Sequence, residues 1–129
     1  MRKLRWINQR DALVILGRLL ALHGGAAGLR DSNLLKSALA RPQQLDAYGE
    51  NPDFIDAATA YTAGIIRNHP FIDGNERTGF VLGVLFLEMN GYRFTASEED
   101  AAQTVLGLAD GTPDETAFAA WMRANVSRR

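Results

Sequence analysis

Residues 53–91 read DFIDAATAYTAGIIRNHPFIDGNERTGFVLGVLFLEMNG and carry the two strongest helix patterns of the chain. Asp53 stands where an N-cap is expected. Apolar and small residues then recur at helical spacing: Ile55, Ala58, Thr62, Ile65 and Ile66. Small residues of the same helix would let another helix approach closely: Ala58, Ala60, Ala63 and Gly64. The pair His69-Pro70 is expected to end this helix, because the residue before proline avoids the α region.

The second half of the same stretch predicts a helix from about Asn75 to Gly91, which is a favourable residue just after a helix. Apolar residues surround most of its circumference: Val81, Leu82, Val84, Leu85, Phe86, Leu87 and Met89. A helix that is apolar nearly all round is expected at the centre of a domain.

Start and stop signals outside this stretch predict four more helices. Asn8 is a cap for a helix that runs to about His23, and the glycines of 24–28 form a flexible connection. Asp31 is a cap for a short helix that Arg41-Pro42 ends, and 43–52 are expected to form a short flap or hairpin.

Two capping signals near the C-terminus predict the last helices. Ser97 begins one that ends near Gly111, and Thr112, followed by Pro113, begins another. Only Tyr92-Arg93-Phe94 and 43–52 have extended character. The predicted fold class is therefore all-α, a compact helical bundle around a central buried helix.

Composition limits the classes of function. The chain has 129 residues, which favours a single domain over 1–129. The formal net charge of -1 gives no electrostatic reason to expect nucleic-acid binding, and no stretch is apolar for long enough to cross a membrane. The absence of cysteine excludes disulfides and thiol catalysis. A cytoplasmic location is expected.

The connection between the two strongest helices has the composition of an anion site. The first amides of a helix have no internal partners and carry partial positive charge. If Asn75 caps the helix, the amides of Glu76, Arg77 and Thr78 can point towards phosphate oxygens. Gly74 has no side chain to block a ligand. Arg77 adds a permanent, fork-shaped charge.

Two further side chains supply reactive groups. Asp73 is a hard oxygen ligand that suits Mg²⁺, whose shell nucleotide phosphates would complete. His69 is the residue of this segment that exchanges a proton near neutral pH. Together these groups suit the attack of a hydroxyl on phosphorus, with His69 as the base and with Asp73 and Arg77 stabilising charge. Each also has a plain structural interpretation, so the combination carries the hypothesis.

The segment HPFIDGNER resembles the signature of the Fic family, His-x-Phe-x-Asp/Glu-Gly-Asn-x-Arg-x-x-Arg. His69, Phe71, Asp73, Gly74, Asn75 and Arg77 all match it. GLRDSNLLKSALARPQ at 28–43 and FLEMNGYRF at 86–94 are similar to the death-on-curing branch, the Doc toxins. The resemblance covers nearly the whole chain.

This resemblance implies a toxin that transfers phosphate from ATP to a Ser or Thr hydroxyl of a protein, with Mg²⁺ as cofactor. His69 would be the catalytic base, Asp73 the metal ligand, and Gly74, Asn75, Glu76 and Arg77 the nucleotide-binding residues. The implied partners are a Phd-type antitoxin and a translation factor such as elongation factor Tu. Transfer of AMP by the same fold, or an inactive antitoxin-binding protein, are the alternatives.

Two positions depart from the signature. Phe80 stands where the last arginine is expected, which favours the Doc branch over AMP transfer. Glu76 stands where AMP-transferring relatives have glycine and Doc has lysine. Its carboxylate either faces the phosphates and weakens activity, or lies in solvent or beside Arg67 and simply favours the helix dipole.

Overall fold

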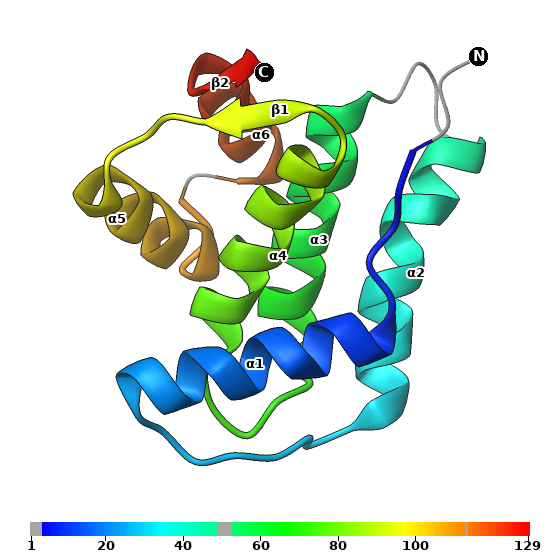
Figure 1. Ribbon diagram of the computed structural model, residues 1–129, viewed down its shortest axis with the longest axis vertical. Helices are drawn as coiled ribbons and strands as arrows, with labels where there is room; N and C mark the ends of the chain where they lie inside the picture. The colour runs from blue at the N-terminus through cyan, green and yellow to red at the C-terminus, as the bar shows by residue number, and fades with distance from the viewer. Residues whose placement is uncertain (1–3, 49–52, 113) are drawn as a thin grey trace.

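The computed structural model describes residues 4–48, 53–112 and 114–129 (Figure 1). Within these residues the fold is helical apart from one short two-stranded sheet, which confirms the predicted all-α class. The elements in chain order are α1 (Gln9–His23), α2 (Ser32–Tyr48), α3 (Phe54–Asn68), α4 (Asn75–Met89), β1 (Tyr92–Phe94), α5 (Glu98–Ala109), α6 (Glu115–Ala124) and β2 (Val126–Arg128). No helix among the described residues is long and apolar enough to cross a membrane.

Helices α3 and α4 pack side by side at the centre of the molecule (Figure 1). Two glycines of α4 make the close approach possible. A Cβ at Gly83 would lie 2.4 Å from Thr62 Oγ1, and one at Gly79 would lie 3.0 Å from the Thr62 carbonyl oxygen. The Thr62 hydroxyl donates a hydrogen bond to the Gly79 carbonyl at 2.8 Å. The small residues of this helix pair therefore fix the distance between the helices that carry the predicted site.

The most completely buried helix is α3, rather than α4 as its apolar circumference suggested. Every residue of α3 from 57 to 66 is buried. On α4, one face is buried against α3, whereas Val81, Val84 and Leu85 are only half-buried. The apolar residues of α4 are thus more numerous than the core can cover.

Side-chain caps begin α1 and α3 where the sequence predicts them. Asn8 accepts from the Asp11 amide at 2.8 Å, and Asp53 forms a reciprocal capping box with Asp56. Burial alone would raise the pKa of Asp53, but hydrogen bonds from Arg123 and from the Asp56 amide outweigh that effect and lower it. The Arg123 contact measures 2.6 Å and ties α6 to the start of α3.

Helix α2 corrects the prediction for 41–52. It continues through Pro42 to Tyr48, so 43–48 are helical and not a flap or hairpin, and 49–52 lie outside the described residues. Proline removes one helical hydrogen bond. Packing against α3 compensates, since Leu39 and Pro42 are buried and Gly64 of α3 lies against the α2 backbone.

The C-terminal region differs from the prediction in its cap and in its last residues. Asp114, not Thr112, caps α6 and accepts from the Ala117 amide at 2.9 Å. Tyr92–Phe94 is extended as predicted, and it pairs antiparallel with Val126–Arg128. The second strand has no sequence signal of its own, because three residues gain strand character only from their partner.

The α1–α2 and α3–α4 connections lie together at one end of the molecule, where α1 crosses the ends of α3 and α4 (Figure 1). The N-terminal segment before α1 is fixed by Tyr61 of α3, whose hydroxyl accepts from the Ile7 amide at 2.8 Å. Burial raises the pKa of Tyr61 to about 12. The predicted site therefore lies on the α3–α4 connection, which contacts the α1–α2 connection.

Candidate active site

His69 stands immediately after α3, with an exposed side chain. Its backbone is left-handed, with φ of 51°, and its amide donates to the Ile65 carbonyl at 3.0 Å. This is the usual hydrogen bond of a helix end in that conformation. The exposed side chain of His69 therefore projects from a defined backbone bend at the end of α3, and Pro70 prevents the helix from continuing.

Asn75 has a different role from the predicted cap. The N-cap of α4 is Gly74, whose φ of 79° is a conformation that glycine adopts without strain. The Asn75 side chain is 1% exposed, and it accepts from the Phe71 amide and donates to the Phe71 carbonyl, each at 3.0 Å. Phe71 itself is fully buried. The Asn75 side chain thus ties the start of α4 to the buried Phe71 and fixes the loop between them.

Replacing Asn75 with alanine should lower the free energy of unfolding by about 2–4 kcal/mol, because both polar groups of Phe71 would lose their partner in a buried place. Urea unfolding measures the change. Asn33→Ala is the matched control, since Asn33 is exposed, and it should change stability by no more than about 0.5 kcal/mol. A loss at Asn75 as small as at Asn33 would contradict this role.

The first free amides of α4 are shifted by one residue from the prediction. The Thr78 amide donates to the Gly74 carbonyl at 2.9 Å, so it is not free. Within the described part of the chain, the amides of Asn75, Glu76 and Arg77 have no acceptor. The Thr78 hydroxyl is also buried without a partner among these residues. The helix start therefore offers donors to an anion, with Asn75 contributing its amide and not its side chain.

Asp73 is exposed and held by two backbone amides. Its Oδ1 accepts from Gly74 at 2.8 Å and its Oδ2 from Ala26 at 3.3 Å. A Cβ on Gly25 would lie 2.7 Å from that Oδ2, so only glycine fits beside it. A carboxylate accepts about four hydrogen bonds, and two positions remain for a cation.

The donor set fits Mg²⁺ of the kind that binds with nucleotide. Among the residues that the structure describes, no three acidic or histidine side chains cluster as a complete metal cage. Mg²⁺ commonly takes one or two carboxylates and completes its shell with phosphate oxygens and water. Asp73 supplies such a carboxylate beside the free amides of α4.

The structure excludes one of the three surroundings considered for Glu76. Arg67 pairs with Glu115 of α6 at 2.6 Å, and Arg41 contacts the same carboxylate at 2.8 Å. The predicted neighbourhood of Arg67 and Glu76 is therefore wrong, because α6 supplies a nearer acid. Glu76 is half-buried, and neither it nor Arg77 forms an ion pair with another described residue.

Sequence reasoning missed how the α1–α2 connection supports this site. Residues 28–31 run along the HPFIDGN loop, with the Ile72 amide donating to Gly28 at 3.1 Å and the Arg30 amide donating to Pro70 at 2.7 Å. Leu29 and Phe71 form an antiparallel bridge. The flexible connection expected at 24–28 is thus fixed against the loop. The closely spaced glycines of 24–28 are the sequence signal for this arrangement, because Gly25 and Gly28 both have positive φ.

The sequence is similar to a known protein family and to proteins of other organisms. Residues 6–87 match the Fic/DOC family. The chain is 38% identical over 88 residues to Toxin Doc of Mycolicibacterium smegmatis, covering 64% of this chain and 65% of that protein, just under two thirds of its length. It is 31% identical over 108 residues to Protein kinase doc of Escherichia phage P1, covering 84% of this chain and 85% of that protein.

Proposed function

Since the chain belongs to the Fic/DOC family, we propose that it is the toxin of a toxin–antitoxin pair that transfers phosphate from ATP to a Ser or Thr hydroxyl of a protein. The observation that carries the proposal is the set of free amides at the start of α4, next in the chain to Asp73 and His69. The names of the two relatives, a toxin and a protein kinase, favour the same activity.

In the proposed reaction His69 accepts the proton of the target hydroxyl, and the hydroxyl oxygen forms a bond to the γ-phosphorus. The bond from that phosphorus to the β–γ bridging oxygen breaks, and ADP leaves with the electron pair. The amides of Asn75, Glu76 and Arg77 and the Arg77 guanidinium stabilise the charge on the phosphate oxygens. Asp73 would hold Mg²⁺, which supplies charge neutralisation between the phosphates.

Phosphate transfer is favoured over AMP transfer by the surroundings of Phe80. Its ring packs against Phe94 and Trp121, with centroids 5.6 Å and 6.4 Å away. The position that carries the last arginine of the Fic signature is therefore part of an aromatic cluster and offers no charge to a nucleotide. AMP transfer remains the second candidate because the other signature residues are present.

Incubation with cell extract and ATP labelled at either the α or the γ phosphate tests the proposal. Label from the γ position, but not from the α position, should appear on a protein band. Label from the α position would show AMP transfer instead. Label from neither, at a concentration where ATP binds, would favour an inactive antitoxin-binding protein. The target class that we propose is a translation factor such as elongation factor Tu, so a band of that identity is expected.

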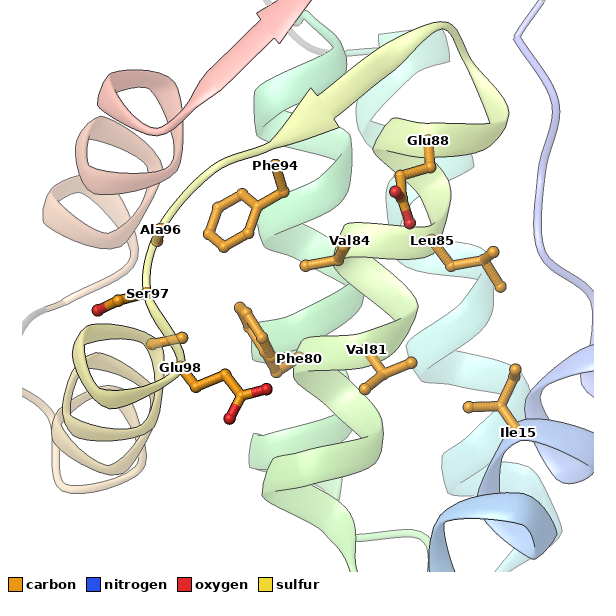
Figure 2. Close-up of a pocket in the computed structure, with 11 residues that line it drawn as sticks. Ile15, Phe80, Val81, Val84, Leu85, Glu88, Phe94, Ala96, Ser97 and Glu98 are labelled. Carbon is orange, nitrogen blue, oxygen red and sulfur yellow. The ribbon is translucent and has the colours of Figure 1, made fainter.

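A second surface suits the antitoxin partner. An apolar groove of about 220 Å³ lies between α4, α1 and the β1–α5 connection (Figure 2). Val81, Val84 and Leu85 of α4 form its floor, and Phe94 lies at one end. Val81, Val84 and Leu85 are the half-buried apolar residues of α4 that the core does not cover fully. An amphipathic helix of a Phd-type antitoxin, with apolar residues every three or four positions, would cover them.

Val84→Glu should weaken binding of the cognate antitoxin by more than about tenfold, because a carboxylate would have to be buried without a partner. Titration calorimetry measures the affinity. Val14→Glu is the control, since Val14 lies on α1, is 48% exposed and does not line the groove. Equal affinities of the two variants would place the antitoxin elsewhere.

A further inference from the structure

Arg30 contacts the backbone that carries the proposed base. Its Nε donates to the His69 carbonyl at 2.7 Å and its Nη2 donates to the Asn68 carbonyl at 3.0 Å. The planar guanidinium matches two neighbouring acceptors at once, which the point charge of a lysine cannot do. The last carbonyls of a helix have no partner within the helix, so Arg30 satisfies two of them at the end of α3.

His69 needs such a contact because of its conformation. It is the only residue other than glycine with positive φ among the residues that the structure describes. A side chain with a Cβ disfavours this region, so the surroundings must hold it there. The amide of His69 is fixed by Ile65 and its carbonyl by Arg30. Both peptide groups that define the direction of the imidazole are therefore bound.

The backbone of Arg30 is fixed to the same loop. The amides of Arg30 and Asp31 both donate to the Pro70 carbonyl, at 2.7 Å and 3.1 Å. The guanidinium thus has little freedom to leave His69, although its side chain is exposed. The three consecutive carbonyls of Asn68, His69 and Pro70 all accept hydrogen bonds from 30–31.

We propose that Arg30 is a positioning residue for the transfer reaction: it holds His69 in the left-handed conformation that directs the imidazole to the target hydroxyl. This inference rests on the proposed function. Without Arg30, residue 69 would also populate ordinary backbone conformations with the ring displaced. A displacement of about 1 Å from a reacting group can cost a hundredfold in rate.

The first test observes the ring itself in the free protein. The chain has two histidines, so NMR resolves the ring signals of His69 and His23 separately. Arg30→Ala should shift or broaden the His69 signals and leave those of His23 unchanged. Added guanidinium ion should restore the His69 signals of the natural protein. Arg93→Ala removes an equal charge from the exposed side chain of Arg93 on β1 and should change neither ring. Unchanged His69 signals in folded Arg30→Ala would overturn the proposal.

The second test measures transfer of γ-label from ATP. Arg30→Ala should lower the rate at saturating MgATP by about ten- to a hundredfold, while the ATP concentration for half-maximal rate stays within about twofold. The transfer rate of Arg30→Lys should lie between those of the natural protein and Arg30→Ala. If Arg30→Ala does not fold, Arg30→Lys replaces it in both tests. Lower thermal stability with an unchanged rate would show that Arg30 only caps α3 and would overturn the proposal. If the natural protein transfers no label, the proposed function fails, and the ring signals still decide the role of Arg30.

Discussion

Replacing His69 with alanine is expected to lower transfer of γ-label to protein by about 10²–10⁴-fold, the usual contribution of a positioned acid–base group. The loss has a direct cause: no other residue among 69–77 is a histidine, the side chain that most often acts as a general acid or base. The exposed imidazole makes no contact that the core needs, so the fold should persist. The label assay with cell extract measures the rate, and circular dichroism checks the fold.

His23→Ala is the matched control for this experiment. His23 is the last residue of α1, is exposed, and lies outside the HPFIDGN loop. Its replacement should leave the rate within about twofold, because no step of the proposed reaction uses it. In cells, expression of the His69→Ala chain should no longer arrest growth if the natural chain does. A His69→Ala protein that transfers label at the natural rate would remove His69 from the mechanism.

Glu76→Lys is expected to raise the affinity for MgATP by at least about tenfold. The Glu76 amide is one of the free donors at the start of α4, and its half-buried carboxylate is not neutralised by an ion pair with any described residue. Two unit charges 4 Å apart interact by about 4 kcal/mol at an effective dielectric constant of 20. Partial exposure and salt reduce this energy, so we expect the affinity for MgATP to rise by a few tens of fold at most. Calorimetric titration of MgATP measures it.

Glu76→Gln separates the removal of repulsion from the gain of attraction. It should lie between the natural protein and Glu76→Lys in affinity, because it loses the negative charge and adds no positive one. Equal affinities of all three proteins would mean that the carboxylate points to solvent. In that case Glu76 is an acidic residue of the first helical turn, which favours the helix dipole by about 0.3–1 kcal/mol.

The sequence predicted those features of the fold that depend on local chemistry. Asn8, Asp53 and Ser97 each cap the helix that follows them, because a short polar side chain satisfies a nearby amide whatever the rest of the chain does. The loop between α3 and α4 has at each end a residue whose own backbone preference limits the helix. Pro70 follows the end of α3, and Gly74 adopts the positive φ at the start of α4. Such features can be recognised without knowledge of the tertiary structure.

The features that the sequence did not predict depend on distant partners. Helix α2 continues through Pro42, which is buried, and α2 packs on α3. Arg67 pairs with Glu115 because α6 packs beside α3. The support of the site by 25–31 arises largely from backbone hydrogen bonds between segments about forty residues apart, which have no sequence pattern.

Titration of MgATP into ¹⁵N-labelled protein, natural and Glu76→Lys, tests most directly whether triphosphate binds at the start of α4. We expect the amide signals of Asn75, Glu76 and Arg77 to shift most, together with the ring signals of His69, and Glu76→Lys to saturate at lower ATP concentration. Shifts confined to another region, such as the Arg41 and Arg67 cluster, would contradict it. So would saturating binding that leaves those three amides unchanged.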